Sequence, residues 1–283
     1  MEKTDIKYSF STYDNSTFLD VKELSEDEYN KYSSIIINLM KLENEQGLYK
    51  IIVLNYNDFI AKTNLSIKNI NHSDMESFSI FYLDINRHIL NVLSSIRTYL
   101  DHTETRLKKE FGKNHTITNK FKELVKKAYD ENFSYRFLYK LRNYSQHCGL
   151  PAGSLKTTAS NNGGFKEVLT LALVRDDLLN NYDSWSIVKE EIKNKDEEFD
   201  IINLLKDKVE ILKNINEEIS KLVYNEYFDE ANSLMELLWL AKNKTGTPCL
   251  LKQNGLSQNV KLSVKWFPYN SLSKITGVVF DLE

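Results

Sequence analysis

The sequence predicts a mainly α-helical protein: an antiparallel helical bundle with a small α/β appendage at the N-terminal end and a β-rich one at the C-terminal end. The chain has 283 residues with only 3 prolines and 9 glycines, a composition that favours long helices over turn-rich β structure. Hydrophobic residues make up 41% and charged residues 27%, as in ordinary globular proteins. Apolar residues recur at three-to-four spacing through the middle of the chain, which is typical of helices packed on one face.

Residues 1–72 are expected to form the mixed α/β appendage. Aromatic and β-branched residues at 7–13 (KYSFSTY) and 49–56 (YKIIVLNY) are typical of strands. Between them, residues 25–42 have a helical pattern, in which Ser25 and Glu28 have the spacing of a capping box.

Residues 73–245 are expected to form the bundle. Its clearest helix covers 73–112, where Ser73 and Glu76 have the spacing of a capping box and Gly112 ends the pattern. The run at 152–164 (AGSLKTTASNNGG) is expected to be a loop, and EVLTLALVR after it a strand or a short buried helix. Further helices are expected at 117–130, from near Ser134 to Gly149, at 185–223 with a break near 194–196, and at 226–243.

Residues 246–283 have turn signals and alternating strand patterns, of which VKLSVKWF is the clearest, so a β-rich appendage is expected there. No run of about 18 apolar residues exists, and the first residues lack the apolar core of a signal peptide. The two cysteines, Cys148 and Cys249, form no CxxC motif. We therefore expect a cytoplasmic protein without a membrane segment, a metal site or a cofactor.

Charge is distributed unevenly along the chain. The net charge is −3, but residues 106–142 carry a net +7 and residues 176–236 a net −10. A local positive field attracts phosphates even when the whole chain is acidic, which makes Lys122, Lys126 and Lys127 candidate RNA-binding residues. One alternative is that both charged regions, 106–142 and 176–236, are solvated helix faces. Another is that the acidic region covers the basic region or binds a partner.

An R-x(4)-H pattern lies at the end of the helix that precedes Gly149, with Arg142, Asn143 and His147 as its polar residues. Chance alone gives about 0.3 matches of the R-x(4–6)-H pattern in such a chain. Arg97 and His102 form a second match, but an i,i+4 salt bridge to Asp101 accounts for that arginine. Arg142 has no acidic residue within four positions and lies at the end of the basic block.

The stretch LRNYSQHCGLP, which follows a long helix containing LSSIRTYLDHTE, resembles the HEPN family of helical-bundle ribonucleases. The signature of that family is R-x(4–6)-H with a polar residue, often Asn, after the arginine. The stretch LALVRDDLLNNYDSW and the long helix after it are also similar to bacterial HEPN proteins of conflict systems. The resemblance covers about residues 73–240. It implies a metal-independent endoribonuclease in bacterial antiviral defence or a toxin-like system, with an inhibitory or defence-system protein as a further partner.

These residue types suit RNA cleavage. Histidine exchanges a proton near neutral pH, so His147 is the candidate acid/base. Arg142 offers a planar pair of N–H donors to phosphate oxygens, and Asn143 would orient either Arg142 or His147. Attack by the RNA 2′-OH on the adjacent phosphate would leave 2′,3′-cyclic phosphate and 5′-OH ends, and DNA, which lacks that hydroxyl, should resist.

Helix geometry adds an expectation about assembly. Residues five apart on a helix differ by about 140° around its axis, so Arg142 and His147 do not share a face. The resemblance implies that two copies of the motif meet across a homodimer and form a composite site. His102, Arg97 and Tyr144 are secondary candidates for the same cleft.

Simpler interpretations stay open for each residue. A histidine at a helix C-terminus often only interacts with the helix dipole. Arg142 could instead cap backbone carbonyls or pair with an acidic residue distant in the sequence. Tyr144 could instead be a packing residue. For the whole chain, the alternatives are a non-catalytic HEPN-like module that binds RNA or protein, and a structural helical adaptor.

Overall fold

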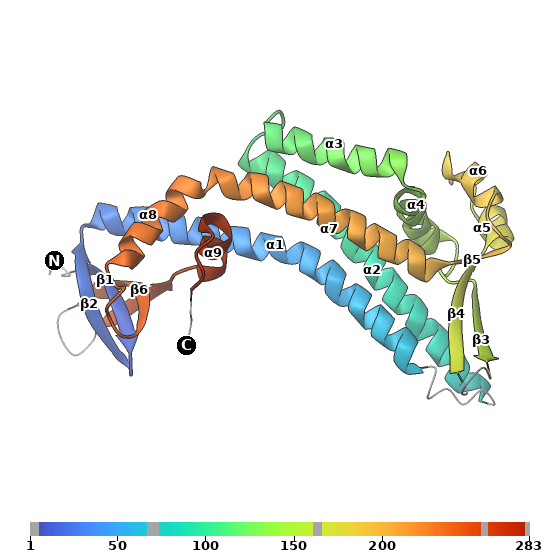
Figure 1. Ribbon diagram of the computed structural model, residues 1–283, viewed down its shortest axis with the longest axis horizontal. Helices are drawn as coiled ribbons and strands as arrows, with labels where there is room; N and C mark the ends of the chain where they lie inside the picture. The colour runs from blue at the N-terminus through green and yellow to red at the C-terminus, as the bar shows by residue number, and fades with distance from the viewer. Residues whose placement is uncertain (1–5, 67–73, 161–165, 256–259, 281–283) are drawn as a thin grey trace. The chain divides into compact units, whose positions relative to one another are not determined.

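The computed structural model describes residues 6–66, 74–160, 166–255 and 260–280. It is mainly helical with two small antiparallel sheets (Figure 1), which confirms the coarse prediction of fold class. The chain divides into two compact units: a terminal unit, Met1–Gly47 with Ser220–Glu283, and a central unit, Leu48–Ile219. The two ends of the chain thus belong to one unit, whereas the sequence suggested separate appendages at 1–72 and 246–283.

A four-stranded sheet of order β2-β1-β6-β7 organises the terminal unit. β1 (Ile6–Asp14) and β2 (Thr17–Leu24) form a hairpin through Asn15 and Ser16, whose φ values of 45° and 65° suit a tight turn. β6 (Thr247–Asn254) pairs antiparallel with β1, with Phe10 opposite Leu250, and β7 (Lys261–Trp266) pairs with β6. The predicted strands at 7–13 and 260–267 are confirmed, and the long-range β1–β6 pairing joins the two ends of the chain.

Helix α1 (Glu26–Ser66) begins with the predicted capping box. The Glu28 amide donates to Ser25 Oγ at 3.1 Å, and the Ser25 amide donates to Glu28 Oε2 at 2.9 Å. Hydrogen bonds from Lys22 and from Ser25 lower the pKa of Glu28 to about 2. The predicted strand at 49–56 is wrong, because these residues continue α1: Ile52 and Phe59, two helical turns apart, are both fully buried.

Two further helices complete the terminal unit. α8 (Phe228–Trp239) is shorter than the helix predicted at 226–243, because turns follow Trp239. α9 (Tyr269–Thr276) was not predicted and ends at Gly277, whose φ is 76°. Ser271 Oγ on α9 donates to the carbonyl of Leu39 at 3.0 Å, which ties α9 to the first part of α1.

Long helices also make up most of the central unit. One face of α2 is apolar and buried from Phe81 to Leu107, whereas Asn91, Thr98 and His102 are exposed. Asp74 caps this helix by accepting from the amides of Glu76 and Ser77, whereas Ser73 lies outside the described residues. The long helices are α2 (Met75–Glu110), α3 (Thr116–Glu131), α4 (Phe133–His147) and α7 (Ile201–Glu226), together with residues 48–66 of α1. The last residues of α7 belong to the terminal unit.

A three-stranded sheet of order β3-β4-β5 lies in the central unit. β4 (Lys166–Val174) confirms the strand alternative for EVLTLALVR, but the loop predicted at 152–164 is wrong where β3 (Ser154–Ser160) pairs with β4. Small polar residues suit an edge strand such as β3, and residues 161–164 lie outside the described residues. The predicted break near 194–196 is confirmed, because α6 (Val188–Lys193) ends there and β5 (Glu198–Asp200) separates it from α7. The short helix α5 (Arg175–Asn181) was not predicted. Each helix in the described ranges is too short or too polar to pass through a lipid bilayer.

Candidate functional site

Helix α4 carries the R-x(4)-H motif and ends at His147. It begins at Phe133, one residue before the predicted start, with Asn132 at the N-cap position. At the other end the amides of Cys148 and Gly149 both donate to the Tyr144 carbonyl, at 2.8 and 3.4 Å. A Cβ atom at Gly149 would lie 2.6 Å from the Tyr144 hydroxyl oxygen, so a larger residue there would have to displace the Tyr144 ring.

An aromatic cluster packs against α4. The Trp185 ring is fully buried and stacks on Phe137 at 5.7 Å and on Tyr144 at 5.8 Å between ring centroids. Its indole Nε1 donates to the Leu178 carbonyl at 2.8 Å. Tyr144, a secondary cleft candidate, is thus a buried packing residue, and it borders a hollow of about 250 Å³ together with Asp177 and other residues.

The segment after the motif is held by α2. The Ala152 amide donates to Asn86 Oδ1 at 2.8 Å, and the Tyr82 hydroxyl donates to the Ala152 carbonyl. Asn86 is 1% exposed, and its amide nitrogen donates to the Tyr82 carbonyl at 3.0 Å. These bonds satisfy both backbone groups of Ala152 and fix the chain five residues beyond His147. The sequence alone did not predict these roles of Asn86 and Tyr82, because no local pattern indicates a hydrogen bond to a backbone group 66 or 70 residues away.

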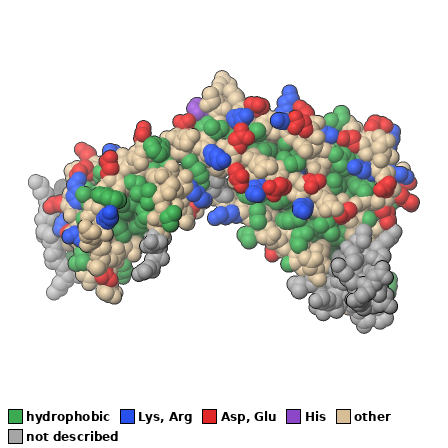
Figure 2. Space-filling model, viewed as in Figure 1, with side chains coloured by type: hydrophobic (Ala, Val, Ile, Leu, Met, Phe, Trp, Pro, Cys, Tyr) green, Lys and Arg blue, Asp and Glu red, His purple; other side chains and the backbone are tan. Residues whose placement is uncertain are grey.

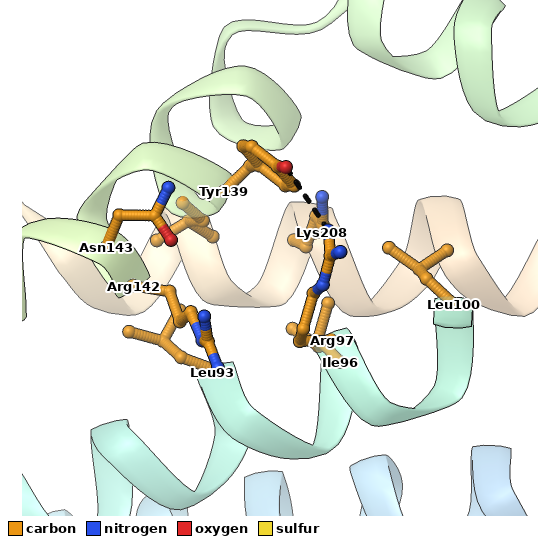
Figure 3. A pocket seen from close by; sticks show the side chains of 9 residues that line it. Leu93, Ile96, Arg97, Leu100, Tyr139, Arg142, Asn143 and Lys208 are labelled. Atoms are coloured by element: carbon orange, nitrogen blue, oxygen red, sulfur yellow. Dashed lines mark hydrogen bonds between the residues drawn. The ribbon is translucent and has the colours of Figure 1, made fainter. Parts of the chain in front are cut away.

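A small cavity lies where α2, α4 and α7 meet; we call it the motif cavity (Figure 3). Its volume is about 20 Å³, slightly more than one water molecule needs. Arg142 and Asn143 of the motif line it, together with Arg97 from α2. The remaining lining residues are Leu93, Ile96, Leu100, Leu138, Tyr139 and Lys208.

The two arginines of the motif cavity differ in their partners. Arg97 Nε lies 2.7 Å from Asp101 Oδ2, which confirms the predicted salt bridge, and its Nη1 donates to the Tyr139 hydroxyl at 3.2 Å. Arg142 is half-buried, and its buried Nε has no hydrogen-bond partner among the described residues. A buried N–H without an acceptor is costly, so the Arg142 guanidinium has free capacity for an anion.

The histidines lie elsewhere. His147 is exposed at the last residue of α4 and does not line the motif cavity. His102 is exposed on α2 and does not line it either. Within one chain, the structure therefore brings Arg142 and Asn143 together with Arg97, and leaves His147, His102 and Tyr144 outside this group.

Sequence reasoning missed Lys208 on α7. Its side chain is 1% exposed, its Nζ donates to the Tyr135 carbonyl at 3.1 Å, and it lies over the Tyr135 ring. Burial lowers the pKa of Lys208 well below its ordinary value. A signal was present: position 208 falls on the buried stripe of α7 formed by Ile201, Leu205, Leu212, Ile215 and Ile219.

The basic block is partly neutralised by the acidic stretch. Lys120 pairs with Glu218 at 3.2 Å, and Arg136 pairs with Glu191 at 2.5 Å. Figure 2 shows basic and acidic side chains interspersed on the visible face of the central unit. The candidate RNA-binding residues Lys122, Lys126 and Lys127 are exposed on α3, and no described residue forms an ion pair with them. These three lysines remain available to a phosphate backbone.

Comparison with protein-family models, curated proteins and solved structures finds no match to this chain. Among the described residues, no three His, Cys, Asp or Glu side chains are grouped so that they could hold a metal ion. The motif and the geometry around it are therefore the features that bear on function.

Proposed function

We propose that this chain is a metal-independent endoribonuclease of the HEPN type, in which Arg142, Asn143 and His147 act on the RNA backbone. The observation that carries the proposal is the half-buried Arg142, whose buried Nε lacks a partner among the described residues, at a cavity that Arg97 and Lys208 also line. No carboxylate lines that cavity among the described residues, so an anion there would meet no like charge. The motif also supports a place for the protein in bacterial antiviral defence or a toxin-like system.

The proposed reaction uses the chain's own side chains. His147, exposed at the helix end, takes the proton from the RNA 2′-OH, whose oxygen then forms a bond to the adjacent phosphorus. The bond from phosphorus to the 5′-oxygen breaks, and that oxygen takes up a proton. Arg142 stabilises the charge that develops on the phosphate oxygens, and Asn143 orients Arg142 or His147. The products are a 2′,3′-cyclic phosphate and a 5′-OH.

Replacing Arg142 by alanine tests the proposal. We expect Arg142→Ala to lower cleavage of total RNA in EDTA by at least about 10²-fold, because the transition-state charge loses its main donor. Arg87→Ala is the matched control, since Arg87 is an exposed arginine that pairs with Asp84 away from the motif. Equal cleavage by both variants would refute the assigned role of Arg142.

We further propose that the working form is a homodimer in which α4 of each copy contributes to a composite site. The different directions of Arg142 and His147 in one chain support this arrangement, because each would then act with a residue of the partner. Mixing Arg142→Ala with His147→Ala, under conditions that allow subunit exchange, should restore about a quarter of wild-type cleavage through mixed dimers. Full activity of a monomer, or no restoration on mixing, would contradict the composite site.

A non-catalytic role is the second candidate. The same separation of Arg142 from His147 within one chain favours a module that binds RNA without cutting it, if no dimer forms. Salt-dependent RNA binding without cleavage by the wild-type protein would support this alternative.

A further inference from the structure

We infer that the motif cavity receives one oxygen atom of a phosphate group, held between the Arg142 guanidinium of α4 and the Lys208 ammonium of α7. Lys208 would then be a second phosphate-binding residue, outside the R-x(4)-H motif. The inference rests on the proposed function in one respect: it takes the phosphate to belong to an RNA backbone. Free inorganic phosphate has the same chemistry, and the experiment below separates the two sources.

Lys208 is buried without a counter-charge. The charged and titratable groups that face the motif cavity with it are Arg97 from α2 and Tyr139 and Arg142 from α4. Within the described ranges no carboxylate lines the cavity, and the Lys208 amine donates its hydrogen bond to a neutral carbonyl, that of Tyr135. A lysine in such surroundings loses its proton readily, and a bound anion supplies the charge that stabilises the ammonium form.

Arg142 lines the same cavity from α4. Its buried Nε has no acceptor among the described residues, so one of its hydrogen-bond directions is unused. The volume of about 20 Å³ accommodates one oxygen atom but not a whole phosphate. Among the lining residues, Asn143 is half-buried and Tyr139 is 36% exposed, and in Figure 3 both project from α4 beside Arg142, so we place the rest of the phosphate on their side of the cavity.

Apart from its contacts with Tyr135, packing does not require a lysine at this position. Position 208 belongs to a stripe that is otherwise aliphatic, and a side chain of similar length without charge would fill the space without the cost of desolvation. A buried polar residue that makes the fold less stable than an apolar residue at the same position would is typical of a functional site.

The test uses Lys208→Met in the full chain, with Lys206→Met as the matched control, because Lys206 is exposed on the same helix. Binding of an oligoribonucleotide with 2′-O-methyl groups, which cannot be cleaved through its 2′ position, is measured by fluorescence anisotropy. Binding of inorganic phosphate is measured by calorimetry. We expect Lys208→Met to weaken both by at least about tenfold, because a charge-assisted hydrogen bond is lost. Its thermal unfolding midpoint should be equal to or above that of the wild type, and Lys206→Met should bind within about twofold.

Unchanged binding of both ligands by Lys208→Met would overturn the inference, as would a wild-type protein that binds neither. Binding of inorganic phosphate without the oligoribonucleotide would overturn the assignment to RNA. If Lys208→Met does not fold, Asn143→Asp replaces it: a carboxylate at the cavity rim should also weaken binding about tenfold, and unchanged binding would overturn the inference. Phosphate binding that depends on Lys208 without any RNA cleavage would refute only the ribonuclease proposal. Cleavage with unchanged binding by Lys208→Met would refute only this inference.

Discussion

Replacing His147 by alanine is expected to lower RNA cleavage in EDTA by about 10²- to 10⁴-fold, the usual contribution of a general acid or base. His147 is exposed at the end of α4, and the described part of the chain offers its ring no hydrogen bond. The loss of activity should therefore occur without unfolding. The favourable interaction of a histidine with the helix dipole is about 0.3–1 kcal/mol, so the stability should fall by no more than that. Cleavage is followed as the rate of RNA loss at equal protein concentration.

Gln146→Ala provides the control for this variant. Gln146 precedes His147 on the same helix turn and is also exposed, so it tests for unspecific effects of truncation there. We expect it to cleave at nearly the wild-type rate. Cleavage by His147→Ala at the rate of Gln146→Ala would remove His147 from the reaction and leave the motif as a surface feature of a helix end.

Replacing Trp185 by alanine should lower the free energy of unfolding by about 3–5 kcal/mol, the range measured for large aromatic residues in cores. The indole is fully buried between Phe137 and Tyr144 of α4, and its Nε1 satisfies the Leu178 carbonyl. The variant loses both rings as packing partners and leaves that carbonyl without its donor. Urea unfolding followed by circular dichroism measures the change.

Ile187→Ala is the matched control, since Ile187 lies two residues further along and is 61% exposed. Its unfolding free energy should change by no more than about 0.5 kcal/mol. A loss of less than about 1 kcal/mol for Trp185→Ala would show that this cluster does not hold α4 in place, and the position of the motif would need another explanation.

The sequence was sufficient for features set by local chemistry. The Ser25–Glu28 capping box, the end of α2 near Gly112 and the Arg97–Asp101 salt bridge all depend on residues within one or two helical turns of each other. The strand predicted at 49–56 failed because β-branched residues such as Ile51 and Ile52 also fit a helix when tertiary packing favours it. The pairing of β1 with β6 joins residues more than 200 positions apart, and no local pattern encodes it.

In the candidate site, too, the sequence alone predicts the features that depend on local spacing and does not predict those that depend on tertiary packing. Spacing on the helix correctly separated Arg142 from His147, since only Arg142 lines the motif cavity. The contribution of Lys208 depends on how α7 packs against α2 and α4. In the sequence, its charged neighbours Lys206 and Asp207 favour the interpretation of a solvent-exposed helix face. Tyr144 was ambiguous because an aromatic residue suits both stacking on a base and packing on Trp185, and the fold places it against Trp185.

The chemistry of the product ends tests the central claim most directly. The wild-type protein is incubated in EDTA with an RNA oligonucleotide and with the same sequence as DNA, and the fragments are analysed by mass spectrometry. The proposed mechanism predicts fragments of the RNA that carry a 2′,3′-cyclic phosphate and a 5′-OH, while the DNA stays intact. Intact RNA, cleaved DNA, or fragments with 5′-phosphate and 3′-OH ends would contradict it.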